Sequence, residues 1–245
     1  MSEISHSKKF VFIANPKTAS TSVAAVLRQA FPGELVKDPP VGAMGLHSNY
    51  LGLRTYLQRE GYNIDEYFVF GFLRHPLTRI SSAHFHQKNA DTYPHTGYIN
   101  PIKDKDIEFY IKWLGAQKNP SSKRLAIGDE SNVLLFRKLN YMFYDESGKL
   151  PSNVFIYKTE EIEARIPEIL KTIDPIHSPF YNKKIPVKNR KHRGRAHTSL
   201  SPESLALLKN YAPLDFEYYK EINMGWLPSC DQFAFGDHAP YVSSV

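Results

Sequence analysis

The feature that most constrains the fold is a short apolar run that leads through a polar loop into a helical pattern. Residues 9–15 read KFVFIAN, and β-branched and aromatic residues in such a run are typical of a buried strand. The polar stretch 16–22, PKTASTS, follows, and apolar side chains then recur at helical spacing until Pro32 and Gly33. A strand, a polar loop and a helix in this order predict the first unit of an α/β fold.

The same order recurs along the chain. A second buried strand is predicted over 67–73, and Arg74-His75-Pro76 turns it into a helix that runs towards Lys88. Four further helices are predicted: 47–60, 104–114 with Asp104 as its cap, 160–173 with a kink at Pro167, and one that begins after the N-cap Ser201. A further strand is predicted at 154–157, after a turn at 145–148. Strands that alternate with helices predict an α/β fold with a mostly parallel sheet flanked by helices.

Length and composition fit one folded domain. The chain has 245 residues, of which 42% are hydrophobic and 23% charged, which excludes a wholly disordered chain. No apolar run approaches the roughly 18 residues that a membrane span needs, and the first ten residues lack the apolar segment of a signal peptide. The single cysteine, Cys230, excludes an intrachain disulfide and a Cys-rich zinc site. We therefore expect a cytoplasmic protein without a membrane span.

The charge balance points to an anionic partner. The formal net charge is +6 at pH 7, but this value does not choose among nucleic acid, nucleotide, polyanionic glycan and membrane surface.

The loop that follows the first strand is a candidate anion site. Free backbone N–H groups and the positive end of the helix dipole converge at such a loop. Lys17 adds an ammonium group, and four hydroxyls follow within a few residues: Thr18, Ser20, Thr21 and Ser22. The glycines of a Walker A loop are absent, and no acidic Mg²⁺ ligands are evident. Simple helix capping by Ser and Thr is the alternative interpretation.

A second basic constellation follows the second strand. Arg74 lies at the predicted carboxyl end of that strand, where ligands gather in open α/β sheets. Ser82 follows two helical turns later. The guanidinium group of an arginine, together with a hydroxyl, is suited to bind a terminal phosphate. The alternative interpretation is a surface arginine and a helix-capping serine, which would give the same sequence pattern.

Taken together, these motifs resemble those of sulfotransferases that use 3′-phosphoadenosine 5′-phosphosulfate (PAPS), and most closely the carbohydrate-type and bacterial branch. Residues 16–22 are similar to the 5′-phosphosulfate loop of that family, PKTxxTS, and residues 72–82 to its 3′-phosphate motif, RxPxxRxxS. Residues 47–50 resemble the segment that bears the catalytic base. Two positions depart from the pattern: Ala19 stands where many members have Gly, and His75 where Asn or Asp is commoner.

Weaker similarity extends the resemblance over residues 9–222. It covers 107–114, 148–161 and 188–218, and it implies a single sulfotransferase domain in which 223–245 form a C-terminal arm or tail. The implied fold is the P-loop-like sulfotransferase fold.

The resemblance implies transfer of a sulfuryl group from PAPS to a hydroxyl or amine, without a metal. Lys17 would stabilise the leaving phosphate oxygen, and Thr18, Ala19, Ser20, Thr21 and Ser22 would hold the 5′-phosphosulfate. The 3′-phosphate would be held by Arg74 and Ser82, with Lys191 and Arg193 of the basic loop 183–195 as further candidates.

The general base is expected to be a histidine, because imidazole titrates near neutral pH. His47 is the candidate, since it lies between the two motifs as the family's base does, and His84 and His86 are the next candidates. The acceptor is expected to be a small molecule or a carbohydrate, with pocket walls from 32–46 and 89–103. Two other functions stay open: a P-loop-like kinase or ATPase, and a basic nucleic-acid-binding protein.

Overall fold

A four-stranded sheet organises the part of the chain that the structure describes. The computed structural model describes residues 2–36, 47–88, 102–116, 137–175 and 200–221. The strands are β1 (Glu3–Ser5), β2 (Phe10–Ile13), β3 (Phe68–Leu73) and β4 (Val154–Lys158), and they lie in this order across the sheet. β1 pairs with β2 antiparallel, whereas β2–β3 and β3–β4 are parallel. The predicted α/β fold with a mostly parallel sheet is confirmed.

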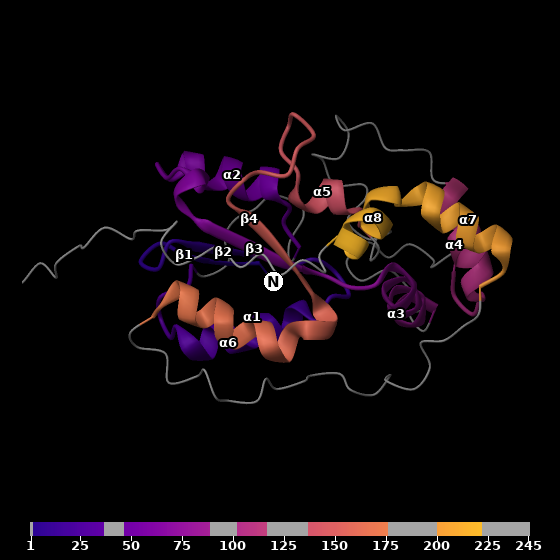
Figure 1. Ribbon diagram of the computed structural model, residues 1–245, viewed down its shortest axis with the longest axis horizontal. Helices are drawn as coiled ribbons and strands as arrows, with labels where there is room; N and C mark the ends of the chain where they lie inside the picture. The colour runs from indigo at the N-terminus through magenta and orange to yellow at the C-terminus, as the bar shows by residue number, and fades with distance from the viewer. Residues whose placement is uncertain (1, 37–46, 89–101, 117–136, 176–199, 222–245) are drawn as a thin grey trace, which may run out of the picture.

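Helices cover both faces of this sheet (Figure 1). α1 (Ser20–Ala30) and α6 (Ile162–Ile173) lie on one face, while α2 (Tyr50–Arg59) and α5 (Leu139–Phe143) lie on the other. Alternation along β3 explains the two layers: Phe68, Phe70 and Phe72 pack towards α1 and α6, and Val69 and Leu73 pack towards α2 and α5. Both faces are apolar because parallel strands are buried on both sides.

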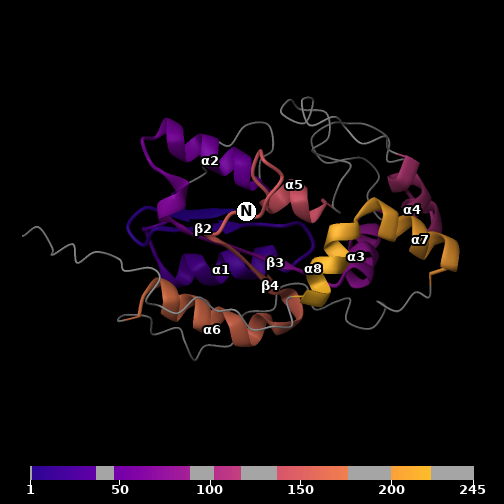
Figure 2. The same cartoon turned by 45° about the horizontal axis from the view of Figure 1, so that its top comes forward.

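A third apolar cluster lies beyond the carboxyl end of the sheet. It packs α3 (Pro76–Lys88) against α4 (Ile107–Ala116) and α7 (Pro202–Tyr211). Both views place these helices together, away from the layers over the sheet, and α8 (Pro213–Glu221) leads back towards α5 (Figures 1 and 2). α8 therefore connects this cluster with the sheet.

Several predicted boundaries are corrected by hydrogen bonding. The helix predicted from residue 47 begins at Tyr50, because the Asn49 side chain accepts a hydrogen bond from the Gly52 N–H at 2.9 Å. Asp104 is not the cap of α4, since the Asp106 carboxylate accepts from the Phe109 N–H at 2.8 Å. A 3₁₀ turn, η3 (Thr159–Glu161), precedes α6, and the predicted N-cap Ser201 is confirmed.

Three short elements had no sequence prediction of their own. β1 is three residues long, and α5 is a helix of five residues. A short 3₁₀ turn, η2 (Ile64–Glu66), also precedes β3. Elements of this length carry too little periodicity to be recognised without their neighbours.

Candidate functional site

The two predicted basic motifs meet at one edge of the sheet. β2 and β3 are parallel neighbours, with Phe12 paired with Phe70 and Ile13 with Gly71. Residues 14–19 leave the carboxyl end of β2 and Arg74 leaves the carboxyl end of β3, so both lie at the same edge. The charge of Arg74 contributes to lowering the pKa of Lys17, in keeping with their position at this shared edge.

The loop after β2 is held in an unusual backbone conformation. Lys17 and Ala19 have φ values of 63° and 61°, in the left-handed region that glycine favours. The Ala19 carbonyl accepts from the N–H groups of Ser22 and Val23, which starts α1, and the Thr18 hydroxyl donates to the Asn15 carbonyl at 2.8 Å. A glycine at position 19 would adopt this conformation without the strain that the Cβ of Ala19 adds.

The N-terminus of α1 is open to an anion. Its N-cap, Ala19, has no side chain that accepts a hydrogen bond, and no acidic residue lies in the first turn. The first N–H groups of a helix have no partner within the helix, and the helix dipole is positive there. The hydroxyls of Ser20, Thr21 and Ser22 make no hydrogen bond to a described residue, whereas that of Thr18 is engaged within the loop.

Lys17 is a half-buried cation without an acidic partner among the described residues. Burial, and then the charge of Arg74, lower the pKa of Lys17 to about 8. A bound anion would reverse this effect, because an opposite charge favours the ammonium form.

Arg74 is oriented by its own helix. Its Nε donates to the Thr78 hydroxyl at 3.1 Å, and that hydroxyl donates to the His75 carbonyl at 3.0 Å. Burial lowers the pKa of Arg74, opposed by the charges of Glu160 and Tyr219. Its two Nη atoms make no hydrogen bond to a described residue, so they remain available to a ligand. Ser82 lies on α3, two turns further, and its hydroxyl is likewise not engaged by any described residue.

The end of β4 adds polar groups that the sequence reasoning did not assign to the site. The Glu160 carboxylate accepts from the His75 N–H at 3.1 Å and from the Tyr219 hydroxyl, so η3, α3 and α8 are joined beside Arg74. The Lys158 ammonium lies 4.9 Å from the centre of the Tyr219 ring. The sequence signal for this contribution was the strand predicted over 154–157, which Lys158 directly follows; the structure ends β4 at Lys158, parallel to β3.

His47 lies beside the same loop, just before α2. Its Nδ1 donates to the Ala14 carbonyl at 2.6 Å, and this bond fixes the proton on Nδ1 and leaves Nε2 as an acceptor. Burial is the main cause that lowers the pKa of His47, to about 4, and the charges of Arg137 and Lys17 act in the same direction, against the Ala14 hydrogen bond. His47 is therefore a neutral imidazole within electrostatic reach of Lys17.

The two other candidate histidines have different environments. His84 faces α4, where its Nε2 bonds the Lys105 carbonyl at 2.7 Å and its ring stacks on Tyr110, so it is a structural residue and not a base of this site. For His86, burial and then the charge of Lys17 lower the pKa. Of the three histidines, His47 is the one that a hydrogen bond joins to the segment after β2, through the Ala14 carbonyl.

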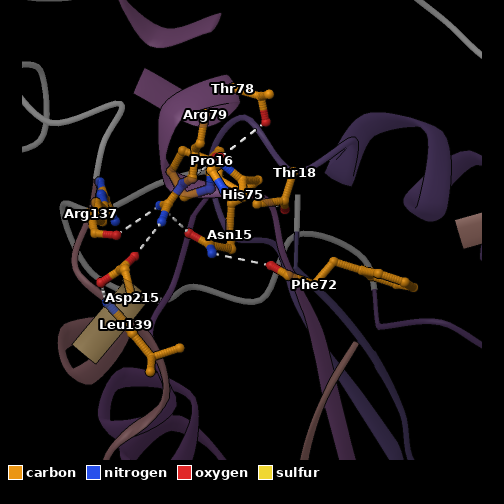
Figure 3. Close-up of polar contacts among 10 residues, drawn as sticks. All are labelled: Asn15, Pro16, Thr18, Phe72, His75, Thr78, Arg79, Arg137, Leu139 and Asp215. Carbon is orange, nitrogen blue, oxygen red and sulfur yellow. Dashed lines mark hydrogen bonds and ion pairs between the residues drawn. The ribbon is translucent and has the colours of Figure 1, made fainter. Parts of the chain in front are cut away.

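A buried arginine holds the loop in place and was not predicted as a site residue. The Arg79 side chain is fully buried, and its partners include the groups joined to it by dashed lines in Figure 3. Its Nε donates to the Pro16 carbonyl at 3.2 Å, one Nη2 bond goes to the Asn15 side chain at 2.7 Å, and Nη1 pairs with Asp215 at 3.0 Å. Nη2 also donates to the Arg137 carbonyl, at 2.7 Å. Arg79 thus ties the loop after β2 to α3, α5 and α8.

The basic loop 183–195, with Lys191 and Arg193, lies outside the described residues, and so do most of the predicted pocket walls, 32–46 and 89–103. Within the described ranges, no three His, Cys, Asp or Glu side chains group as a metal site. None of the helices found in those ranges has the length and apolar character needed to cross a membrane.

Comparison with known proteins adds no relative. No protein-family model matches the chain, and neither a curated protein nor a solved structure shows significant similarity to it.

Proposed function

We propose that this protein is a PAPS-dependent sulfotransferase. The observation that carries the proposal is the placement of Lys17 and Arg74 at the carboxyl ends of two adjacent parallel strands, neither in an ion pair with a described carboxylate. Two cations at one edge of a parallel sheet, beside an open helix N-terminus, suit a nucleotide with two separate phosphate groups. The similarity of both motifs to that family supports the same function.

Each end of the nucleotide has a matching set of groups. Lys17, the N–H groups at the start of α1 and the free hydroxyls of that turn would hold the 5′-phosphosulfate. The Nη atoms of Arg74 and the Ser82 hydroxyl would hold the 3′-phosphate, with Arg74 oriented by Thr78. A guanidinium fork binds phosphate oxygens in a fixed geometry, which explains an arginine at this position.

In the proposed transfer, the acceptor oxygen or nitrogen attacks the sulfur atom from the side opposite the phosphate. A bond forms between the acceptor atom and sulfur, and the bond between sulfur and the bridging phosphate oxygen breaks. That oxygen keeps the electron pair, and the Lys17 ammonium stabilises its charge. The proton of the acceptor passes to a base, and the products are the sulfated acceptor and adenosine 3′,5′-bisphosphate.

His47 is the proposed base. Its lowered pKa keeps the imidazole neutral at pH 7, and the Ala14 carbonyl holds the proton on Nδ1, so Nε2 is the proton acceptor. A bound nucleotide would raise the pKa of His47, because its anionic phosphate groups would offset the positive charge of Lys17. The base would therefore strengthen when the site is loaded.

The proposal is tested by thermal unfolding in the presence of adenosine 3′,5′-bisphosphate, AMP, or ATP with Mg²⁺. A ligand at about 100 times its Kd stabilises by about 2.7 kcal/mol, or roughly 5–10 °C in Tm for a chain of this size. We expect that shift with the bisphosphate, a smaller one with AMP, and loss of the bisphosphate shift in Arg74→Ala. Arg54→Ala is the matched control, because Arg54 lies on α2 and pairs with Glu146 at the surface.

The outcomes separate the competing functions. A shift with ATP and Mg²⁺ alone would refute the sulfotransferase proposal and favour a kinase or ATPase. With a bisphosphate shift in hand, labelled PAPS tests the transfer: His47→Ala should bind the bisphosphate as wild type does and lose turnover by about 10²–10⁴-fold. Wild-type turnover in His47→Ala would exclude His47 as the base.

A further inference from the structure

Among the described residues, two arginines are almost fully buried, and their partners differ. Arg79 is 0% exposed and pairs with Asp215, as buried charges normally do. Arg137 is 6% exposed, and no carboxylate of a described residue pairs with it. A buried cation without an opposite charge is costly, because burial removes its hydration and no ion pair replaces it.

The position of the Arg137 guanidinium is set by two contacts. Its Nη1 donates to the His47 carbonyl at 2.6 Å, and its central carbon lies 5.7 Å from the centre of the Tyr141 ring. The backbone is fixed as well, because the Arg137 carbonyl accepts from Arg79 at 2.7 Å (Figure 3). One N–H of the guanidinium is thus satisfied by His47, and the planar group keeps further N–H donors.

Arg137 lies beside the proposed base. Its Nη1 donates to the backbone carbonyl of His47, and its charge, like that of Lys17, acts on the His47 imidazole. In the proposed reaction the acceptor must reach the imidazole of His47. An acceptor bound there would bring its own substituents close to Arg137.

We propose that Arg137 binds an anionic group of the acceptor, so that the acceptor class is a hydroxyl or amine compound with a carboxylate or sulfate group close to the reacting atom. This inference rests on the proposed function and specifies its acceptor. The anion supplies the opposite charge that the described residues do not give Arg137. Carboxylate and sulfate share the paired oxygens that a guanidinium binds.

Matched pairs of acceptor probes that differ in one charge test the inference. The pairs are 4-nitrophenyl β-D-glucuronide with the β-D-glucoside, and 4-hydroxyphenylacetate with its amide. Titration calorimetry measures their Kd on protein saturated with adenosine 3′,5′-bisphosphate. We expect wild type to bind the anionic member of at least one pair about tenfold or more tightly, as a charge-assisted hydrogen bond allows. Arg137→Gln should bind both members of that pair within about threefold.

Two further variants make the result specific. Arg137→Lys keeps the charge but not the fork, and it should retain part of the preference. Arg54→Gln removes a surface charge and should retain all of it. An unchanged Kd for the bisphosphate in Arg137→Gln shows that the variant is folded and that its nucleotide site is intact.

The results test the sulfotransferase function and the acceptor inference separately. If wild type does not bind the bisphosphate, the sulfotransferase function fails and the acceptor inference fails with it. If the bisphosphate binds but every pair binds equally, or if the preference survives in Arg137→Gln, the acceptor inference alone is overturned.

Discussion

At the scale of single residues, the site combines cations that lack acidic partners with one buried ion pair. Lys17 and Arg137 have no described carboxylate beside them, whereas Arg79 is paired with Asp215. The two kinds of cation respond differently to substitution. Removing an unpaired cation should cost ligand affinity, and removing one member of the buried pair should cost stability.

Lys17 should make ligand binding depend on pH. Its pKa is lowered to about 8, so the empty site loses this positive charge as the pH rises through that value. We expect the Kd for adenosine 3′,5′-bisphosphate, measured by calorimetry, to increase about threefold or more between pH 7 and pH 9. In Lys17→Met the affinity should be lower at pH 7 and nearly constant over this range. An equal pH dependence in both proteins would assign the effect to another group.

Asp215 should be essential for stability. Its two carboxylate oxygens accept from Arg79 at 3.0 Å and from the Leu139 N–H at 2.9 Å. Asp215→Asn leaves the guanidinium of Arg79 buried without its counter-charge, and we expect a loss of about 3–5 kcal/mol in the free energy of unfolding, measured with urea. The control is Glu146→Gln, which breaks the exposed pair with Arg54 and should cost less than about 1 kcal/mol. Similar losses in both variants would contradict this prediction.

At the scale of elements, the loop after β2 owes its position to packing between strands and helices that are distant in sequence. Asn15 donates from Nδ2 to the Phe72 carbonyl at 3.1 Å, so the loop is also tied to β3. The short helix α5 packs on β3 from the other side, with Met142 and Phe143 in the core. The strands β2 and β3 and the helix α5 therefore pack together with the loop that carries the candidate site.

Gly71 of β3 provides a test of this packing. A Cβ at this position would lie 2.7 Å from Phe143 Cζ and 3.2 Å from the Ile13 carbonyl oxygen. Gly71→Ala should therefore lower the free energy of unfolding by about 1–3 kcal/mol in urea denaturation, because the buried ring must move. Gly115→Ala in α4 is the matched control, since a Cβ added there would meet no atom of the described residues within 4 Å, and it should not destabilise. A neutral Gly71→Ala variant would show that α5 is not tightly packed.

At the scale of the whole molecule, histidines with lowered pKa values make the fold sensitive to acid. Among the described residues, loss of hydration is the largest cause that lowers the pKa of His6, His47, His75, His84 and His86. A histidine with a lowered pKa in the folded state takes up its proton more readily when unfolded. The stability that these groups contribute is complete above about pH 6.5 and is lost as the pH falls towards their folded-state pKa values.

We therefore expect the free energy of unfolding to be lower at pH 5 than at pH 7.5. His47, with a pKa of about 4, should alone account for about 2 kcal/mol of the difference. The measurement is urea denaturation at both pH values, and His47→Gln should show a smaller difference than wild type. Equal stability at the two pH values would contradict the prediction.

Much of the site could be predicted because short motifs follow apolar strands. The runs 9–15 and 67–73 identified two strands, and parallel pairing then placed Lys17 and Arg74 at one edge. Local patterns also found the N-cap Ser201 and the turn at 145–148, where Gly148 has a φ of 73°. These features depend on neighbours within a few residues, which the sequence displays directly.

The roles of Arg79, Arg137 and Asp215 could not be predicted in this way. The partners of Arg79 are 64 and 136 residues distant in sequence at Asn15 and Asp215, and no local pattern links them. His84 and His47 were both plausible imidazoles until the fold directed His84 to α4 and His47 to the loop. The sequence by itself determined the alternation of strands and helices and the anion-binding character of two loops. Only the tertiary structure decided which buried charges are paired and which histidine is bonded to the segment after β2, because burial and long-range contacts arise when distant segments pack together.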